Sequence, residues 1–117
     1  MSVCISEDTE CRTMKANKFF EELLGVASGS NMSQSAPSSE KPNFKAYLNE
    51  KEIPAEELPM QRAAATGKPV FNDEFDILLA DGRIVNFYGH AVPLFDCQGQ
   101  IRGAIGVFDD VTERKLA

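Results

Sequence analysis

Side chains that could act as nucleophiles or bases are few in this chain of 117 residues and lie far apart. Cys4, Cys11 and Cys97 match no spacing of a zinc site or a dithiol motif, and an odd number of cysteines favours reduced thiols. No basic pattern beside them would stabilise a thiolate. The preferred role of the cysteines is therefore packing, and redox sensing is the alternative.

The single histidine and the paired carboxylates do not suggest acid–base chemistry either. His90 falls on the side of an alternating strand pattern that we expect to face outward, which favours an interface or solvent role over a ligand role. The acidic pairs at 21–22, 56–57 and 109–110 lack a partner nucleophile or base, and they suit solvated helix faces or caps. The sequence predicts no catalytic residue and no metal site.

The pattern that says most about function is a helix that begins directly after a strand. Asp110 is followed three residues later by Glu113, which fits a capping box in which Asp110 accepts the first amide hydrogens of a new helix. A sheet that leads straight into a helix indicates a domain that passes a structural change onward. The predicted transmission junction consists of Asp110, Val111, Thr112 and Glu113.

Three antiparallel strands should precede this junction. Residues 71–79 alternate with the period of two of a half-buried strand, with Phe71 on the apolar side. A hairpin turn is predicted at 81–82, because Asp and Gly tolerate the positive φ of tight turns. Two further strands are expected over 83–95 and 101–108.

The first half of the chain predicts shorter elements. Strands over 3–6 and 11–16 would form a hairpin that brings Cys4 toward Cys11, and a helix over 18–24 should follow. Residues 26–43 are rich in Ser without an apolar period, which predicts a flexible loop. The remaining elements are an extended segment at 44–48, a helical turn at 55–58 and a helix over 60–66.

In this order the segments resemble the PAS domains of bacterial and archaeal sensory proteins. The similar segments are 15–25 (KANKFFEELLG), 52–64 (EIPAEELPMQRAA), 75–83 (FDILLADGR), 91–96 (AVPLFD), 99–103 (GQIRG) and 106–114 (GVFDDVTER). The resemblance covers nearly the whole chain apart from the Ser-rich segment. It implies an α+β domain over residues 1–111, with a five-stranded antiparallel sheet covered on one face by short helices. Residues 112–117 would begin an outgoing signalling helix.

The resemblance implies a sensory or regulatory domain in a multidomain signal-transduction protein, most often a two-component sensor histidine kinase. The parent protein would then be an enzyme, with the transferase activity of a histidine kinase or the activity of a cyclase. That activity would belong to an output domain in the same polypeptide, not to this domain. Two alternatives are open: a ligand-free dimerisation or scaffold module, and the input domain of a diguanylate cyclase. A cytoplasmic location is expected, and the parent protein is free to carry a membrane anchor elsewhere.

Positions that should face the helices define a candidate pocket for a small-molecule ligand. Small residues among bulky ones either let a helix approach the sheet or leave room for a ligand, and close packing is the preferred interpretation. Flavin-binding relatives use a cysteine on a helix, and haem-binding relatives use a histidine on a helix. The predicted helices of this chain contain neither residue. Flavin and haem are therefore disfavoured, and the cofactor is unknown. The candidate pocket residues are Leu58, Met60, Phe75, Ile77, Phe87, Gly89, Ala91, Ala104, Gly106 and Phe108.

The opposite face of the sheet carries an apolar patch that no predicted helix covers. Patches of this kind mark interaction surfaces, so the sequence predicts a homodimer contact. The patch consists of Tyr88, His90, Val92, Ile105 and Val107.

Charge and hydropathy exclude two classes of partner. With 18 acidic and 12 basic residues the net charge is −6, and no Lys- or Arg-rich stretch suggests nucleic-acid binding. No segment approaches the ~20 consecutive apolar residues of a membrane span, so this part of the protein should not insert into a membrane.

Overall fold

The computed structural model describes residues 1–37 and 42–113 of the chain. Its elements are β1 (Ser2–Ser6), β2 (Lys15–Ala16), α1 (Lys18–Leu24), β3 (Lys45–Leu48), β4 (Lys51–Glu52), the 3-10 turn η1 (Ala55–Glu57), α2 (Pro59–Thr66), β5 (Val70–Leu78), β6 (Ile84–Phe95) and β7 (Ile101–Asp110). Among the described residues, no helix has the length and apolar character needed to cross a bilayer.

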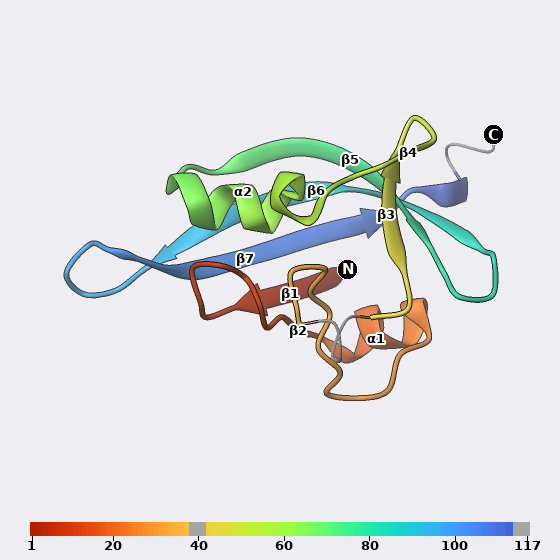
Figure 1. Cartoon of the computed structure of the whole chain (residues 1–117), viewed down its shortest axis with the longest axis horizontal. Coiled ribbons are helices and arrows are strands. Elements are labelled where there is room, and N and C mark those ends of the chain that lie inside the picture. The colour runs from red at the N-terminus through yellow and green to blue at the C-terminus, as the bar shows by residue number, and fades with distance from the viewer. Residues whose placement is uncertain (38–41, 114–117) are drawn as a thin grey trace.

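All strands join one antiparallel sheet in the order β2-β1-β7-β6-β5-β3-β4 (Figure 1). The α+β class and the predicted sheet are confirmed. Five of the seven strands, β1, β3, β5, β6 and β7, have four residues or more. The sequence predicts β3 only as an extended segment, and the strand that it predicts over 11–16 is reduced to the two-residue β2. The two-residue strands β2 and β4 form the edges of the sheet.

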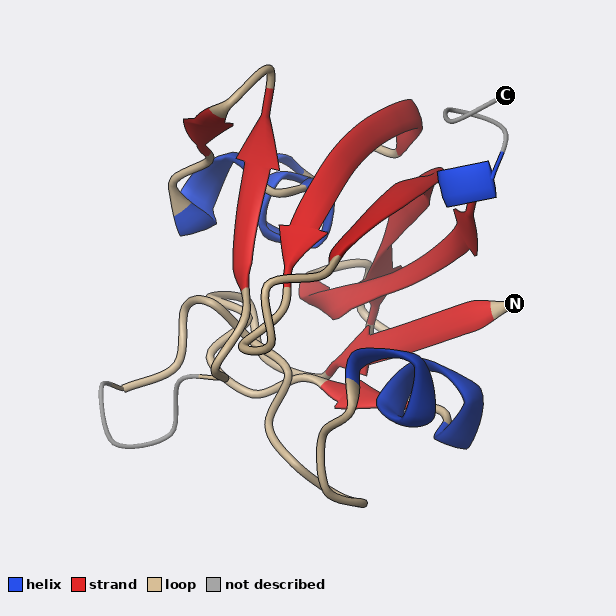
Figure 2. Ribbon diagram, turned by 90° about the vertical axis from the view of Figure 1, so that its right-hand side faces the viewer, coloured by secondary structure: helices blue, strands red, loops and turns tan. Residues whose placement is uncertain are grey.

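The sheet is strongly curved, and the helices pack on its two halves (Figure 2). Helix α2 contacts β5, β6 and β7, whereas α1 contacts β1 and β2. Four aromatic rings join these layers, with centroids 5.4 Å apart for Phe20 and Phe87 and 5.3 Å apart for Phe75 and Phe108. The core therefore forms between both helices and the sheet, and the Phe20 ring joins α1 to the aromatic side chains of the long strands.

Local signals set the helix ends where the sequence predicted them. The Asn17 side chain accepts a hydrogen bond from the Phe20 amide at 3.1 Å and caps α1. Gly25 and Gly67 end α1 and α2 in the left-handed conformation, with φ of 69° and 72°. Pro59 occupies the first turn of α2, where its missing amide hydrogen costs nothing.

The predicted strand over 11–16 is wrong in its first part, since only Lys15–Ala16 pairs with β1. The Asp8 carboxylate accepts hydrogen bonds from the backbone amides of residues 10, 12 and 13 at 3.1, 2.9 and 3.2 Å. Because these amides bond to a side chain, they do not take part in strand pairing. Cys11 consequently lies in a turn, with φ of 52°, and not in a strand.

The alternation predicted over 71–79 fails at Phe71. The pairing of β5 with β6 shifts between residues 70 and 73, and Asn72 has a φ of 56°. Such a bulge adds a residue to one strand and reverses the side chains that precede it. Phe71 is therefore 62% exposed and packs against His90, with ring centroids 5.6 Å apart.

The Ser-rich segment contains no helix or strand over 26–37 and 42–43, and its central residues are buried. Met32 is 4% exposed and its amide donates to the Met14 carbonyl at 3.0 Å. The fully buried Ser33 hydroxyl donates to the Cys11 carbonyl. The described part of this segment therefore forms a wall of the interior, while residues 38–41 lie outside the described residues.

Candidate functional site

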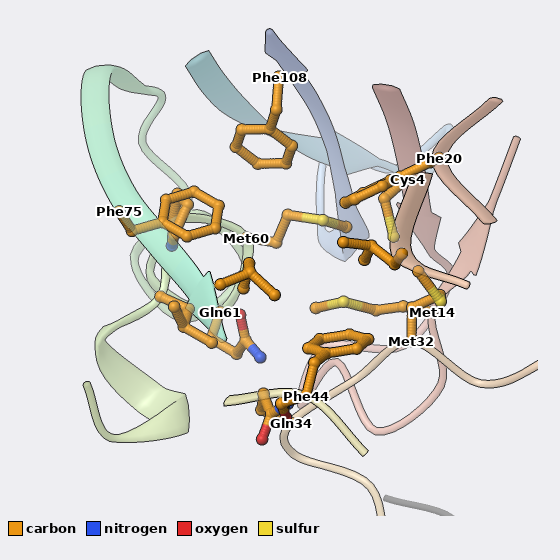
Figure 3. A pocket seen from close by; sticks show the side chains of 14 residues that line it. Cys4, Met14, Phe20, Met32, Gln34, Phe44, Met60, Gln61, Phe75 and Phe108 are labelled. Carbon is orange, nitrogen blue, oxygen red and sulfur yellow. The ribbon is translucent and has the colours of Figure 1, made fainter. Parts of the chain in front are cut away.

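A cavity of about 60 Å³ lies between the sheet, the two helices and the Ser-rich segment (Figure 3). The side chains that line it come from β1, α1, β5, β7, the start of α2 and the connections between these elements. Its 14 lining residues are Cys4, Met14, Phe20, Leu24, Met32, Gln34, Phe44, Leu58, Pro59, Met60, Gln61, Phe75, Ile77 and Phe108.

Half of the predicted pocket residues line this cavity. These five are Leu58, Met60, Phe75, Ile77 and Phe108. The other five are Phe87, Gly89, Ala91, Ala104 and Gly106, which are buried on β6 and β7 without lining the cavity.

The small residues on β6 and β7 serve close packing, because α2 contacts both strands. A Cβ added at Gly106 would lie 3.0 Å from Cγ of Met60 and 2.7 Å from the Phe108 ring. At Gly89 an added Cβ would meet the Val107 carbonyl oxygen at 2.1 Å. Neither position has room for a side chain: Gly106 is crowded by Met60 of α2 and by Phe108, and Gly89 by the backbone of β7.

Sequence reasoning missed nine lining residues. The helical pattern over 18–24 was a usable signal for Phe20 and Leu24. No periodic pattern marks Met32 and Gln34, which lie in the Ser-rich segment. The nine are Cys4, Met14, Phe20, Leu24, Met32, Gln34, Phe44, Pro59 and Gln61.

The cavity is electrically neutral, since none of its 14 described lining residues carries a charge. Burial raises the pKa of the Cys4 thiol to about 12, so this side chain stays protonated at neutral pH. Burial also raises the pKa of Cys11 to about 11, and its thiol donates a hydrogen bond to the Met60 carbonyl at 3.6 Å. Both buried thiols are thus poor nucleophiles, whereas Cys97 is exposed.

Two glutamine amides are the polar groups at the cavity. Nε2 of Gln34 donates to the carbonyl oxygen of Phe44 at 2.5 Å. Nε2 of Gln61 donates to Oγ of Ser35 at 3.2 Å. The amide of Gln61 points from α2 toward the space enclosed by the aromatic and methionine side chains (Figure 3).

The predicted transmission junction begins at the end of β7. Oδ1 of Asp110 accepts a hydrogen bond from the Thr112 amide at 3.0 Å, and the Thr112 hydroxyl donates to the same oxygen. Thr112 and Glu113 are helical, and residues 114–117 of the expected outgoing helix lie outside the described residues. Within the described chain, the Glu113 carboxylate accepts no hydrogen bond, so only the Asp110 half of the predicted capping box forms.

Asn86 on β6 holds this junction, and sequence reasoning missed it. Its backbone carbonyl accepts a hydrogen bond from the Val111 amide at 2.8 Å, and its backbone N–H donates to Oγ1 of Thr112 at 3.0 Å. Its side chain donates to the Asp76 carboxylate on β5. The start of the outgoing helix is thereby connected to two strands of the sheet in addition to the one that it continues.

The predicted patch residues lie together on the open face of the sheet. All five are half-buried, whereas the alternate positions 85, 87, 89 and 91 on β6 are buried. His90 pairs with Val107 and Val92 with Ile105, and β1 extends both rows with Val3 and Ile5. The structure also gives His90 a local role, because its Nδ1 accepts a hydrogen bond from the amide of residue 72 at 3.0 Å.

Comparison with known proteins gives one consistent result. The sequence profile of a family described as PAS fold matches residues 1–116. The virulence sensor protein BvgS of Bordetella pertussis is 29% identical over 107 residues. That alignment covers 92% of this chain and 8% of BvgS, so the chain corresponds to a small part of its relative.

Two solved structures share the fold at low sequence identity. The PAS domain of a protein from Colwellia psychrerythraea has a TM-score of 0.60 and 18% identity, with 97% of this chain and 88% of that chain covered. The PAS domain of Bordetella pertussis BvgS has a TM-score of 0.54 and 22% identity, with coverage of 98% and 77%. With the family profile matching residues 1–116 and the curved antiparallel sheet in place, the chain belongs to the PAS domain family.

Proposed function

We propose that this chain is the sensory domain of a two-component sensor histidine kinase, in which a small molecule in the inner cavity alters the outgoing helix. The observation that carries the proposal is that cavity and junction share strands. Phe108 lines the cavity two residues before Asp110 on β7. On β5, Phe75 and Ile77 line the cavity on either side of Asp76, which bonds to Asn86. The sensory role is supported by the similarity to the virulence sensor protein BvgS. The kinase assignment is supported by the shared fold of a sensory box histidine kinase/response regulator from Burkholderia thailandensis, with a TM-score of 0.53 and 16% identity.

A ligand that displaces these walls has a short path to the output. A shift of β7 moves Asp110 directly, and a shift of β5 acts through Asp76 and Asn86 on the backbone of Val111. A ligand changes the equilibrium between two states only if it binds them unequally. Moving the population from 1:99 to 99:1 requires about 5.5 kcal/mol of differential binding.

Native mass spectrometry of the domain, purified without a denaturing step, tests the proposed ligand site. We expect a small-molecule adduct that is released on denaturation. Met32→Trp should lose the adduct, because the indole would occupy the cavity that Met32 lines. Leu48→Trp is the matched control, since Leu48 is 44% exposed, and it should keep the adduct.

Two results would contradict this site. A wild-type domain without any adduct favours a ligand-free scaffold. An adduct that the folded Met32→Trp variant retains places the ligand outside the inner cavity. Circular dichroism of each variant shows that the fold is intact before its mass spectrum is compared.

The open face of the sheet favours a second candidate function, a dimerisation module that holds output domains together. Its two apolar rows extend over β1, β7 and β6, and Ile105 lies at the centre of one row. Ile105→Glu would bury an unpaired carboxylate in the contact. We therefore expect the variant to dimerise with an affinity at least about tenfold weaker than that of the unmodified domain.

Sedimentation measures this association directly. Phe19→Glu is the control, because Phe19 is 52% exposed on α1, away from the open face of the sheet, and it should leave the dimer intact. The patch is not a dimer contact if the unmodified domain is a monomer at high concentration, or if Ile105→Glu remains fully dimeric.

A further inference from the structure

We propose that the ligand of the inner cavity is an uncharged, single-ring aromatic molecule with one hydrogen-bond donor, and that Gln61 accepts this hydrogen bond. The inference rests on the proposed function, because it takes the cavity to be the ligand site. Charge, lining chemistry, hydrogen-bonding capacity and volume each restrict the ligand independently.

The first restriction is charge. The lining contains no Lys, Arg, His, Asp or Glu, and its one ionisable group, the Cys4 thiol, is protonated at neutral pH. A charged ligand would lose its hydration without gaining an ionic partner, which is strongly unfavourable. Carboxylates, ammonium compounds and phosphate esters are therefore excluded.

The second restriction is the chemistry of the walls. Aromatic side chains from α1, β5, β7 and the residue before β3 surround the cavity, together with three methionines. Aromatic rings attract one another edge to face, and thioether sulfur interacts favourably with aromatic rings. These walls favour an aromatic ring over an aliphatic chain. The aromatic and methionine side chains are Phe20, Phe44, Phe75, Phe108, Met14, Met32 and Met60, half of the 14 lining residues.

The third restriction is the hydrogen-bonding capacity of Gln61. Its side chain is on α2, the residue is 7% exposed, and its Nε2 is already committed to Ser35. Its Oε1 accepts no hydrogen bond from any residue in the described part of the chain. The amide points toward the cavity, and when the methionine side chains move aside for a ligand, this oxygen becomes accessible to an O–H or N–H group of that ligand (Figure 3).

The fourth restriction is volume. The space of about 60 Å³ is smaller than the roughly 150 Å³ of a cavity that binds benzene. Methionine side chains have three rotatable bonds and repack easily, so Met14, Met32 and Met60 can supply the missing room. Because the observed space already falls short of what one ring needs, a fused-ring ligand, which needs still more, would require movement of the sheet or helices.

Three small probes separate these requirements: phenol, toluene and benzoate. Phenol has the donor and is uncharged at pH 7, toluene has the same shape without the donor, and benzoate is an anion. The methyl signals of 13C-labelled methionines report the location by NMR. Met14, Met32 and Met60 should shift on binding, whereas Met1, which is 65% exposed, should not.

We expect phenol to bind about 3- to 10-fold more tightly than toluene, as befits one hydrogen bond, and benzoate not to bind. Gln61→Leu keeps the size of the side chain and removes the acceptor, so it should abolish the preference for phenol and leave toluene binding intact. Gln98→Leu, in the exposed turn between β6 and β7, is the matched control and should change neither affinity.

The outcomes distinguish this inference from the proposed function. Equal binding of phenol and toluene, or a preference for phenol that survives Gln61→Leu, overturns the role of Gln61 while the cavity remains a ligand site. Tight binding of benzoate at the cavity methionines overturns the requirement for an uncharged ligand. If no probe shifts Met14, Met32 or Met60 at millimolar concentration, the proposed ligand site itself is wrong.

Discussion

Phe87→Ala should lower the free energy of unfolding by about 3–5 kcal/mol, the usual loss when a large aromatic side chain is removed from a packed core. Phe87 is 1% exposed on β6, and its ring centroid lies 5.4 Å from that of Phe20, 5.8 Å from Phe75 and 6.4 Å from Phe108. The side chain therefore joins α1 to the three long strands. Denaturant unfolding followed by circular dichroism measures the change.

Phe95→Ala is the matched control on the same strand. Phe95 is 50% exposed, so its truncation should change the free energy of unfolding by only about 0.5 kcal/mol. Small domains are stable by roughly 5–15 kcal/mol in total, and Phe87→Ala should accordingly unfold at a much lower denaturant concentration. Equal effects of the two substitutions would show that the four rings do not form the centre of the core.

The inward position of Phe87 was predictable from the sequence, because the period of two holds throughout the central part of β6. Val85, Phe87, Gly89 and Ala91 are all buried, as this period requires. The same reasoning failed at Phe71, where the β-bulge changes the face on which the side chain lies. A bulge depends on the pairing of two strands, and the pattern within a single strand does not reveal it.

The cavity was only partly predictable, for a related reason. Residues on β5 and β7 follow from strand alternation, but Met32 and Gln34 reach the interior through a segment without a repeating pattern. Their positions depend on hydrogen bonds such as that between the Met32 amide and the Met14 carbonyl. The loss of a strand at Cys11 has a similar origin, because one carboxylate binds several backbone amides.

The junction shows the same division between local and distant signals. Asp110 could be identified because its hydrogen-bond partner, Thr112, is only two residues away. Asn86 could not, since it meets Thr112 across 26 residues of sequence and only after β6 and β7 have paired. The helix start was thus readable from the sequence, and the connection that makes it a candidate for signal transmission was not.

Asp110→Ala should cost the isolated domain only about 0.5–2 kcal/mol, the usual loss for a helix cap. In the full-length parent, the same substitution should change the basal or signal-dependent output about 5-fold or more, the range typical of coupling between sites. The physical reason is that the Asp110 carboxylate fixes the direction in which Thr112 leaves the sheet. Melting temperature and output activity, measured side by side, test both parts.

Two further variants make the comparison specific. Asp109→Ala removes the neighbouring exposed carboxylate on β7, which makes no hydrogen bond within the described chain, and should leave output unchanged. Thr112→Val removes the hydroxyl that bonds to Asp110 and to the Asn86 amide, so it should reproduce the effect of Asp110→Ala. Because the two substitutions remove one shared interaction, the double variant should show less than the sum of their effects.

The response of the parent protein decides whether this junction transmits a signal. If Asp110→Ala leaves both the basal output and its response unchanged, Asp110 is a helix cap without a role in transmission, and the path from β5 through Asn86 to Val111 has no function. If Asp109→Ala alters output as strongly as Asp110→Ala, the effect comes from lost negative charge at the end of β7. Only a large effect of Asp110→Ala and Thr112→Val, with Asp109→Ala unchanged, assigns transmission to the hydrogen bonds at the start of the outgoing helix.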